Sequence, residues 1–339
     1  MVTGGPQVRG YLGVPLIGRD GLPLGALCVI DLVPREFTQR HLRTLQELAD
    51  QVVVLLEQRR RDHADGLLSE HLLDEARDPV RLRSALDNGE LVPYYQPLVD
   101  IHTGQPRQLE ALLRWQHPER GPLPPLSFLP AIVAGALIVA VGRVMLDASL
   151  SQLAELEQAG LHLPGGVAVN VASSQLARPG LARDVLSALH RYDLHGTQLT
   201  VEITEATALP DLALARRELE ALTAMGVHVV IDDFGVGWSN LTRLLQLPAD
   251  GLKIDREIAA AVVEDPRAAA MVTSTVALAK SMGLEVTAEG IENQQVADDL
   301  AHAGCDFGQG WLYSPAVPAD QLLPLLTRLG ASPATLRSA

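Results

Sequence analysis

The sequence predicts an α/β fold, a variant of the (β/α)8 TIM-type barrel with an antiparallel first strand. From residue 79 onward, short apolar stretches alternate with amphipathic helical patterns, and about 250 residues are typical of an eight-stranded barrel. Polar residues, most of them acids, stand near the ends of those stretches. Only residues 101–107 separate the first two expected strands. This is too short for a helical crossover, so these two strands should form an antiparallel hairpin.

The eight expected strands are short apolar runs bounded by turn residues. They begin near Pro93, Gln108, Val167, Gln198, Val227, Gly251, Leu284 and Asp306. Most of the segments between them carry apolar residues at helical spacing, as in 212–225, 268–282 and 294–303. We therefore expect the barrel to occupy residues 79–333.

One charge-free stretch, residues 121–142, is long enough to suggest a membrane span. Its first half contains Pro122, Pro124, Pro125 and Pro130, which interrupt a helix. Only residues 131–141 can form an unbroken apolar helix, and that is too short to cross a bilayer. We expect a buried helix there and no membrane span.

The first sixty residues follow a different pattern. Residues 11–16 and 24–30 look like two strands joined by a turn at 18–21, and a helix with an apolar stripe begins near Thr38. A hairpin and one helix cannot bury a core alone, so residues 1–60 are expected to be part of a domain. Residues 61–78 should form a helical linker. Charged residues run from 57 to 78, and they fit equally a solvated face or an extended dimeric signalling helix.

Composition and net charge favour some classes of protein over others. Apolar residues make up 47% and charged residues 20%, which indicates a globular protein. The net charge of −14 argues against a nucleic-acid duplex as partner, although a small phosphate ligand held by metal ions stays possible. Cys28 and Cys305 are far apart and suggest neither a disulfide framework nor a zinc site. Met1 is not followed by a signal-peptide core, so a reducing cytoplasmic location is expected.

The most informative segment is the apolar run 229–231 followed by Asp232 and Asp233. Neighbouring side chains on a regular strand point to opposite faces, so both acids can serve one site only where the strand stops and the chain turns. Phe234 and Gly235 begin a segment that can supply this turn. Two adjacent carboxylates repel unless a cation neutralises them. From this segment alone, a solvated turn and a metal site are about equally expected.

Other strand candidates also deliver a polar residue near their ends, where barrel enzymes build their sites. These residues are Glu110, Asn170, Glu202, Glu205, Lys253, Asp255, Glu289, Glu292 and Gln309. Each alone has an ordinary structural explanation, such as a helix cap or an ion pair. Together they would repel too strongly without bound cations, and a set of oxygen donors with no His or Cys points to Mg²⁺ or Mn²⁺. The residues thus predict a metal-dependent barrel enzyme that acts on a phosphate ester, by a two-metal mechanism.

The motif Glu110-Ala111-Leu112, with Tyr95-Gln96-Pro97 before it and Asp232-Asp233-Phe234-Gly235 after it, resembles the EAL domain family. The resemblance spans residues 79–329. It implies a cyclic di-GMP phosphodiesterase that produces linear pGpG and uses two Mg²⁺ or Mn²⁺ ions. Residues 1–60 resemble the C-terminal half of a GAF domain, a small-ligand sensor module. A homodimer is expected from the apolar stripe between Leu42 and Leu56 and because members of the family are commonly dimers.

The resemblance also implies roles for single residues. Glu110, Asn170, Glu202 and Asp232 correspond to the ligands of one metal, and Asp232 and Asp233 to those of the second. Lys253 corresponds to the residue that positions and activates the attacking water, Glu289 to an acid of the metal shell, and Glu205 to the acid that anchors the loop after Asp233. Asp255, Glu292 and Gln309 fall on further active-site positions, and Gln96 and Arg114 on positions that contact the dinucleotide.

Three departures from the family pattern stand out. Val236 replaces a common threonine and Trp238 a common tyrosine, and residues 131–136 lack the adjacent acids usual there. A catalytically inactive EAL domain that senses cyclic di-GMP or a protein is the alternative function, and an inactive fragment is a third. Because the expected metal ligands and Lys253 are all present, the sequence favours an active enzyme over these two alternatives. A Gly-Gly-Asp/Glu-Glu-Phe signature of diguanylate cyclases is absent from the sequence.

Overall fold

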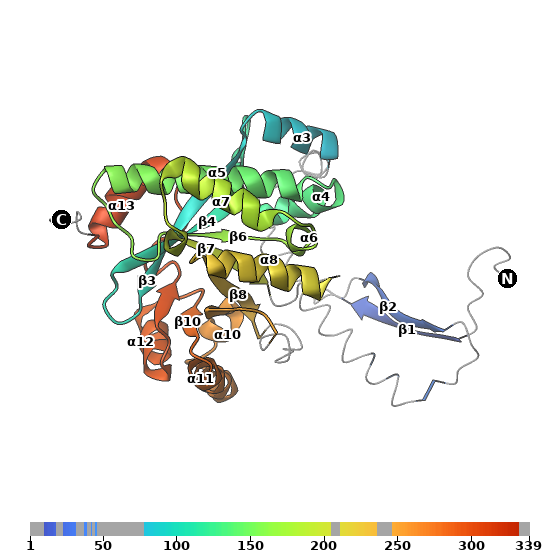
Figure 1. Cartoon of the computed structure of the whole chain (residues 1–339). Helices are drawn as coiled ribbons and strands as arrows, with labels where there is room; N and C mark the ends of the chain where they lie inside the picture. The colour runs from blue at the N-terminus through green and yellow to red at the C-terminus, as the bar shows by residue number, and fades with distance from the viewer. Residues whose placement is uncertain are drawn as a thin grey trace. The chain divides into compact units, whose positions relative to one another are not determined.

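The computed structural model describes residues 10–17, 23–31, 37–38, 42, 45, 78–204, 211–235 and 246–331. The chain divides into two units, Met1–Asp74 and Glu75–Ala339. Figure 1 shows their elements along the chain. Among the described residues, no helix is both long enough and apolar enough to cross a membrane.

The N-terminal unit contains the expected hairpin. Strand β1 (Gly10–Ile17) pairs antiparallel with β2 (Pro23–Asp31), and the register shifts by a bulge at Leu16/Ile17. Val14 from β1 is buried together with Leu45, which lies in a helical segment. The linker expected at 61–78 lies outside the described residues except for Asp78, so its helical form stays a prediction.

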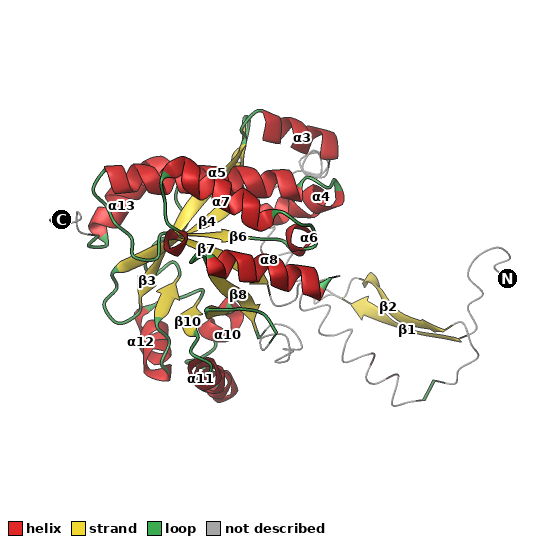
Figure 2. Cartoon of the chain, viewed as in Figure 1, coloured by secondary structure: helices red, strands yellow, loops and turns green. Residues whose placement is uncertain are grey.

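The second unit is built around a closed barrel of eight strands, drawn in yellow inside the red helices of Figure 2. The barrel strands are β3 (Leu91–Asp100), β4 (Pro106–His117), β6 (Val167–Asn170), β7 (Leu199–Thr204), β8 (His228–Phe234), β9 (Gly251–Ile254), β10 (Glu285–Ala288) and β11 (Phe307–Gln309). All eight predicted strands are confirmed. Strand β3 is antiparallel to both neighbours, β4 and β11, and every other barrel pairing is parallel, so the expected reversed first strand is also confirmed.

Helices and short extra elements cover the barrel. They are α3 (Pro79–Asp87), β5 (Gly121–Leu123), η1 (Pro125–Ser127), α4 (Leu129–Ala134), α5 (Ile138–Gln158), α6 (Ser173–Leu176), α7 (Leu181–Tyr192), η2 (Gly196–Gln198), α8 (Leu212–Ala224), α10 (Arg256–Ala260), α11 (Pro266–Ser281), α12 (Gln294–Ala303), η3 (Ala319–Gln321) and α13 (Leu322–Arg328). Helix α8 is an example of how these helices pack on the barrel unit: Ala215, Leu219 and Leu222 recur at helical spacing and form its fully buried face. Asp211 caps the helix by accepting the Leu214 N–H at 2.9 Å.

The single apolar helix expected over residues 131–141 is wrong. Helix α4 ends at Ala134, and Ala136 takes a left-handed conformation with φ 55° before α5 begins at Ile138. The Leu137 N–H donates to the Ile132 carbonyl at 2.9 Å and the Ala136 N–H to Val133, which is the hydrogen-bond pattern of a helix stop. The chain therefore turns here, although no glycine occupies the left-handed position itself.

Candidate active site

The carboxyl ends of the parallel strands border a cavity of about 690 Å³. This volume lies within the usual range of small-molecule sites. Its polar lining includes Gln96, Glu110, Asn170, Asp232, Glu289, Glu292 and Gln309. Leu129, Ile138, Val141 and Met145, from the α4–α5 region, give it an apolar wall. Much of the predicted set of polar residues thus borders one cavity.

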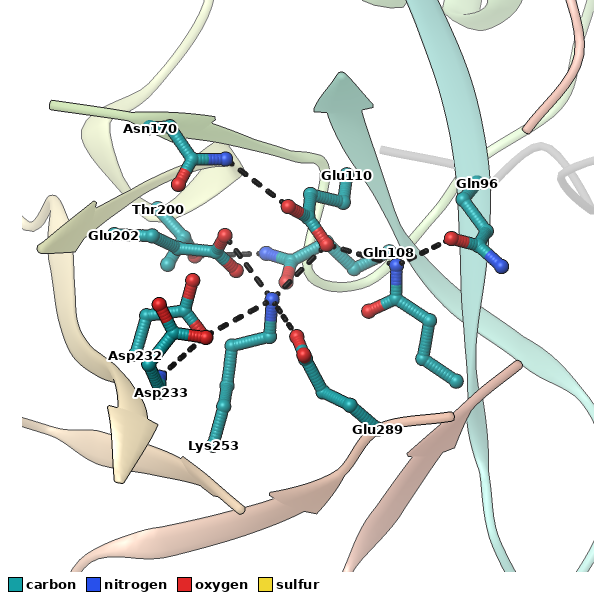
Figure 3. A network of polar contacts seen from close by, with 11 residues as sticks. Gln96, Gln108, Glu110, Asn170, Thr200, Glu202, Asp232, Asp233, Lys253 and Glu289 are labelled. Atoms are coloured by element: carbon teal, nitrogen blue, oxygen red, sulfur yellow. Dashed lines mark hydrogen bonds and ion pairs between the residues drawn. The ribbon is translucent and has the colours of Figure 1, made fainter. Parts of the chain in front are cut away.

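Glu110 on β4 is buried and receives three hydrogen bonds (Figure 3). Its Oε1 accepts from Asn170 Nδ2 at 3.0 Å, and its Oε2 from Lys253 Nζ at 2.9 Å and Gln309 Nε2 at 2.8 Å. Burial by itself raises the pKa of Glu110, but the charge of Lys253 and these hydrogen bonds outweigh it and leave the pKa below its ordinary value. Glu110 is therefore held as a carboxylate.

Lys253 on β9 is the buried cation of the site, with 1% of its surface exposed. Its Nζ lies 2.9 Å from a Glu110 oxygen, 3.2 Å from Glu202, 3.7 Å from Asp232 and 2.5 Å from Glu289 (Figure 3). Burial lowers the pKa of the ammonium group, but the surrounding carboxylates raise it well above its ordinary value. Lys253 thus stays protonated.

The two adjacent aspartates reach one site through a bulge in β8. Contrary to the expected end of the strand, β8 continues through both acids to Phe234. Its pairing with β9 is irregular between Ile231 and Phe234, and Asp233 takes the left-handed conformation with φ 56°. The Asp233 N–H donates to Asp232 Oδ1 at 2.9 Å. One carboxylate oxygen from each of Asp232, Asp233 and Glu289 lies within 4.8 Å of the others.

The site holds more negative than positive charge. Burial, and then the charges of neighbouring acids, raise the pKa of Glu202 and of Asp232, that of Asp233 to about 6 and that of Glu289 to about 8. A hard divalent cation suits this set, because carboxylate and amide oxygens are its preferred ligands and its charge would relieve the repulsion. Four carboxylates, those of Glu110, Glu202, Asp232 and Glu289, lie within 3.7 Å of the Lys253 ammonium group, and the Asp233 carboxylate lies near those of Asp232 and Glu289.

Gln96 and Gln309 are also brought together. Gln309 Nε2 donates to Gln96 Oε1 at 3.1 Å as well as to Glu110, and Gln96 Nε2 donates to the Ser314 carbonyl at 2.9 Å. Gln309 is only 4% exposed. Both glutamines line the cavity, and together they orient the Glu110 carboxylate.

Five described residues of the predicted set do not line the cavity: Glu202, Asp233 and Lys253, which belong to the charged cluster beside it, and Arg114 and Asp255. The Arg114 guanidinium donates to the Leu113 carbonyl at 2.8 Å and lies 5.8 Å from the centre of the Tyr94 ring. Asp255 caps α10 by accepting the Glu257 N–H at 2.8 Å, although its charge still raises the pKa of Asp233. Glu292 does line the cavity and is exposed. Glu205, Val236 and Trp238 lie outside the described residues.

Sequence reasoning missed Trp311, which borders the cavity and is 71% exposed. It also missed the apolar wall. The sequence does hold a signal for Trp311, because it stands two residues after Gln309, which is itself a predicted site residue. The apolar wall had no such signal, since its members come from α4 and α5 rather than from strand ends.

Comparison with known proteins gives consistent matches. The EAL domain model matches residues 80–316 and the GAF domain model matches residues 1–56. MucR of Pseudomonas aeruginosa, a bifunctional diguanylate cyclase/cyclic di-GMP phosphodiesterase, is 41% identical over 242 residues, which cover 71% of this chain and 35% of that protein. The cyclic di-GMP phosphodiesterase PdeR of Escherichia coli is 34% identical over 240 residues, covering 71% of this chain and 36% of PdeR. The chain thus spans about a third of the length of these two relatives.

Solved structures match the same part of the chain. The PaMucR phosphodiesterase in complex with c-di-GMP superposes with a TM-score of 0.67 at 41% identity, over 71% of this chain and 97% of that one. The EAL domain of Mycobacterium smegmatis DcpA gives a TM-score of 0.61 at 32% identity, over 72% of this chain and 99% of that domain.

Proposed function

Because the chain belongs to the EAL domain family, we propose that it hydrolyses cyclic di-GMP to linear pGpG with the help of divalent metal ions. The observation that carries this proposal is the cluster of four carboxylates around the buried Lys253, beside a cavity at the carboxyl ends of the strands. Relatives named as cyclic di-GMP phosphodiesterases support the choice of substrate.

The oxygen donors divide into two proposed ligand sets. Glu110, Asn170, Glu202 and Asp232 would hold one Mg²⁺ or Mn²⁺ ion, Asp232 and Asp233 would hold the second, and Glu289 would belong to the metal shell. When bound, such ions offset phosphate charge and lower the pKa of a coordinated water. The left-handed Asp233 backbone supports this division, because it allows both aspartates to face one cluster.

The protein's own groups would do the remaining work. The Lys253 ammonium, held in place by its four carboxylates, would position the attacking water and offset negative charge in the transition state. Gln309 and Gln96 would keep the Glu110 carboxylate oriented, because their amides form a hydrogen-bonded chain to it. We propose that Glu292, exposed at the cavity, contacts the substrate and that Glu205 anchors the loop after Asp233.

A turnover assay tests the function. The full chain would be incubated with cyclic di-GMP and Mg²⁺ or Mn²⁺, and the products resolved by chromatography. We expect linear pGpG to form, and Glu110→Ala or Lys253→Ala to slow its formation at least about 100-fold. Glu285→Gln is the matched control: Glu285 is the first residue of β10 and Glu289 follows its last, and exposed Glu285 lies away from the cavity. It should keep the wild-type rate.

The alternatives give different results in the same experiment. Tight binding of cyclic di-GMP without turnover, at every metal concentration, would indicate a catalytically inactive domain that senses the nucleotide. Neither binding nor turnover would indicate an inactive fragment. The homodimer, the cytoplasmic location and a sensing role for the GAF segment stay predictions.

A further inference from the structure

Trp311 is the one large, exposed apolar side chain of the described residues that borders the cavity. It is 71% exposed, whereas Trp115, the other described tryptophan, is completely buried. Within the described part of the chain, neither an aromatic ring nor a cationic group lies against the Trp311 ring. A broad, neutral face is therefore presented beside a strongly acidic cluster.

The backbone that carries Trp311 is firmly held. The Leu312 N–H donates to the Ile291 carbonyl at 2.9 Å, and the Ser314 N–H donates to the Gly310 carbonyl at 3.1 Å. A Cβ atom at Gly310 would lie 2.1 Å from the Ile291 oxygen, so only glycine permits this close approach. Trp311 thus extends from a fixed turn, and the cost of ordering it on ligand binding is small.

The same turn fixes Trp311 relative to the acidic cluster. Gln309, two residues earlier, donates to Glu110 Oε2 at 2.8 Å and is buried. A ligand whose phosphate lies at the carboxylates, held there by metal ions, would therefore have a flat, uncharged surface available for its next chemical group. In a nucleotide that group is the base, and aromatic side chains bind bases by stacking.

We propose that Trp311 is the stacking platform for one purine base of the substrate, a subsite separate from the carboxylates that serve the phosphate. This inference rests on the proposed function, since it takes a cyclic dinucleotide as the ligand. A purine covers more of an indole ring than a pyrimidine does, so Trp311 should favour cyclic dinucleotides with purine bases.

Binding measurements on the full chain test the platform. Dissociation constants would be measured by calorimetry for cyclic di-GMP and for a cyclic dinucleotide with pyrimidine bases, and KM and kcat wherever turnover occurs. Trp311→Ala should weaken cyclic di-GMP binding about 10- to 100-fold and shrink the preference for purine bases. Trp311→Phe should recover most of the affinity. Leu323→Ala, at a 49% exposed position on α13 away from the cavity, is the control.

Each outcome is decisive. If Trp311→Ala binds within about twofold of the wild type, or if Trp311→Phe is as weak as Trp311→Ala, the platform is refuted. Binding by the wild type without turnover refutes the proposed hydrolysis but still tests the platform through the dissociation constants. No binding by the wild type to either dinucleotide refutes both. Because Trp311 is exposed, the variants should unfold at the wild-type temperature.

Discussion

Replacing Lys253 by methionine removes the cation that faces four carboxylates, and the cost should depend on pH. Removing one partner from a buried ion pair typically costs about 3 to 5 kcal/mol. We expect a loss of that size at pH 8 without divalent metal, because Lys253 is 1% exposed and its Nζ lies 2.5 to 3.7 Å from carboxylate oxygens. Lys280→Met is the matched control. Lys280 is 42% exposed with one ion pair to Asp306, so its loss should cost less than about 1 kcal/mol.

The sign of the pH effect follows from the carboxylates. The pKa values of Glu202, Asp232 and Glu289 are already raised in the folded protein, and losing the ammonium raises the pKa of these carboxyl groups further, so the folded variant binds a proton that the unfolded chain does not. Stability therefore increases as the pH falls through these raised values. One proton more than in the wild type returns about 1.4 kcal/mol per pH unit, or about 3 kcal/mol between pH 8 and pH 6.

Urea unfolding in EDTA at pH 8 and pH 6 measures both quantities. The deficit of Lys253→Met should fall by about 3 kcal/mol to about 0 to 2 kcal/mol at pH 6. At pH 8, added Mn²⁺ should restore much of the stability. If Lys253→Met loses the same unfolding free energy at both pH values, or none at pH 8, the claim that Lys253 neutralises the surrounding carboxylates is refuted.

Three further predictions concern the backbone, the protons and the metal ligands. Ala136→Gly should raise the free energy of unfolding by about 1 kcal/mol, because glycine adopts the left-handed φ of 55° without strain; an unchanged urea midpoint would contradict this. Affinity for Mn²⁺ should rise from pH 6 to pH 8, because Asp233 and Glu289, with pKa values of about 6 and about 8, must lose protons to bind the metal. Calorimetry in buffers of different ionisation heat should detect the released protons. Proton uptake on Mn²⁺ binding would contradict this prediction. Asp232→Asn should weaken the binding of both metal ions, and Asp233→Asn mainly that of one, which metal titration measures. Loss of both metal ions in Asp233→Asn would contradict the assignment of Asp232 as the bridging ligand.

The barrel and the residues around its rim follow from local sequence patterns. Apolar runs that end in polar residues identified all eight strands, and closing the barrel brought Glu110 to Lys253, which lies 143 positions later in the chain. The loop before Pro106 was too short for a crossover, and this was enough to predict the reversed strand β3. The strands, the rim residues and the reversed strand could be predicted because each depends on the spacing of residues along the chain.

Other features depend on contacts between distant segments. The bulge at Asp232 and Asp233 exists only in the register of β8 with β9, so the sequence suggested a turn instead. Ala136 adopts a conformation that alanine rarely takes, so its neighbours predicted a continuous helix. Gln309 is buried against Glu110, which lies 199 positions earlier in the chain, and its place near a strand end did not reveal this partner. In these places tertiary packing outweighed local preference.

The most direct test of the proposed hydrolysis is the fate of water oxygen. The full chain would convert cyclic di-GMP in oxygen-18 water with Mn²⁺, and the product would be analysed by mass spectrometry. Hydrolysis at the carboxylate cluster predicts linear pGpG with one labelled oxygen in its new terminal phosphate, and no such product from Lys253→Ala. Unlabelled product, or cyclic di-GMP that is bound and recovered intact, would contradict it.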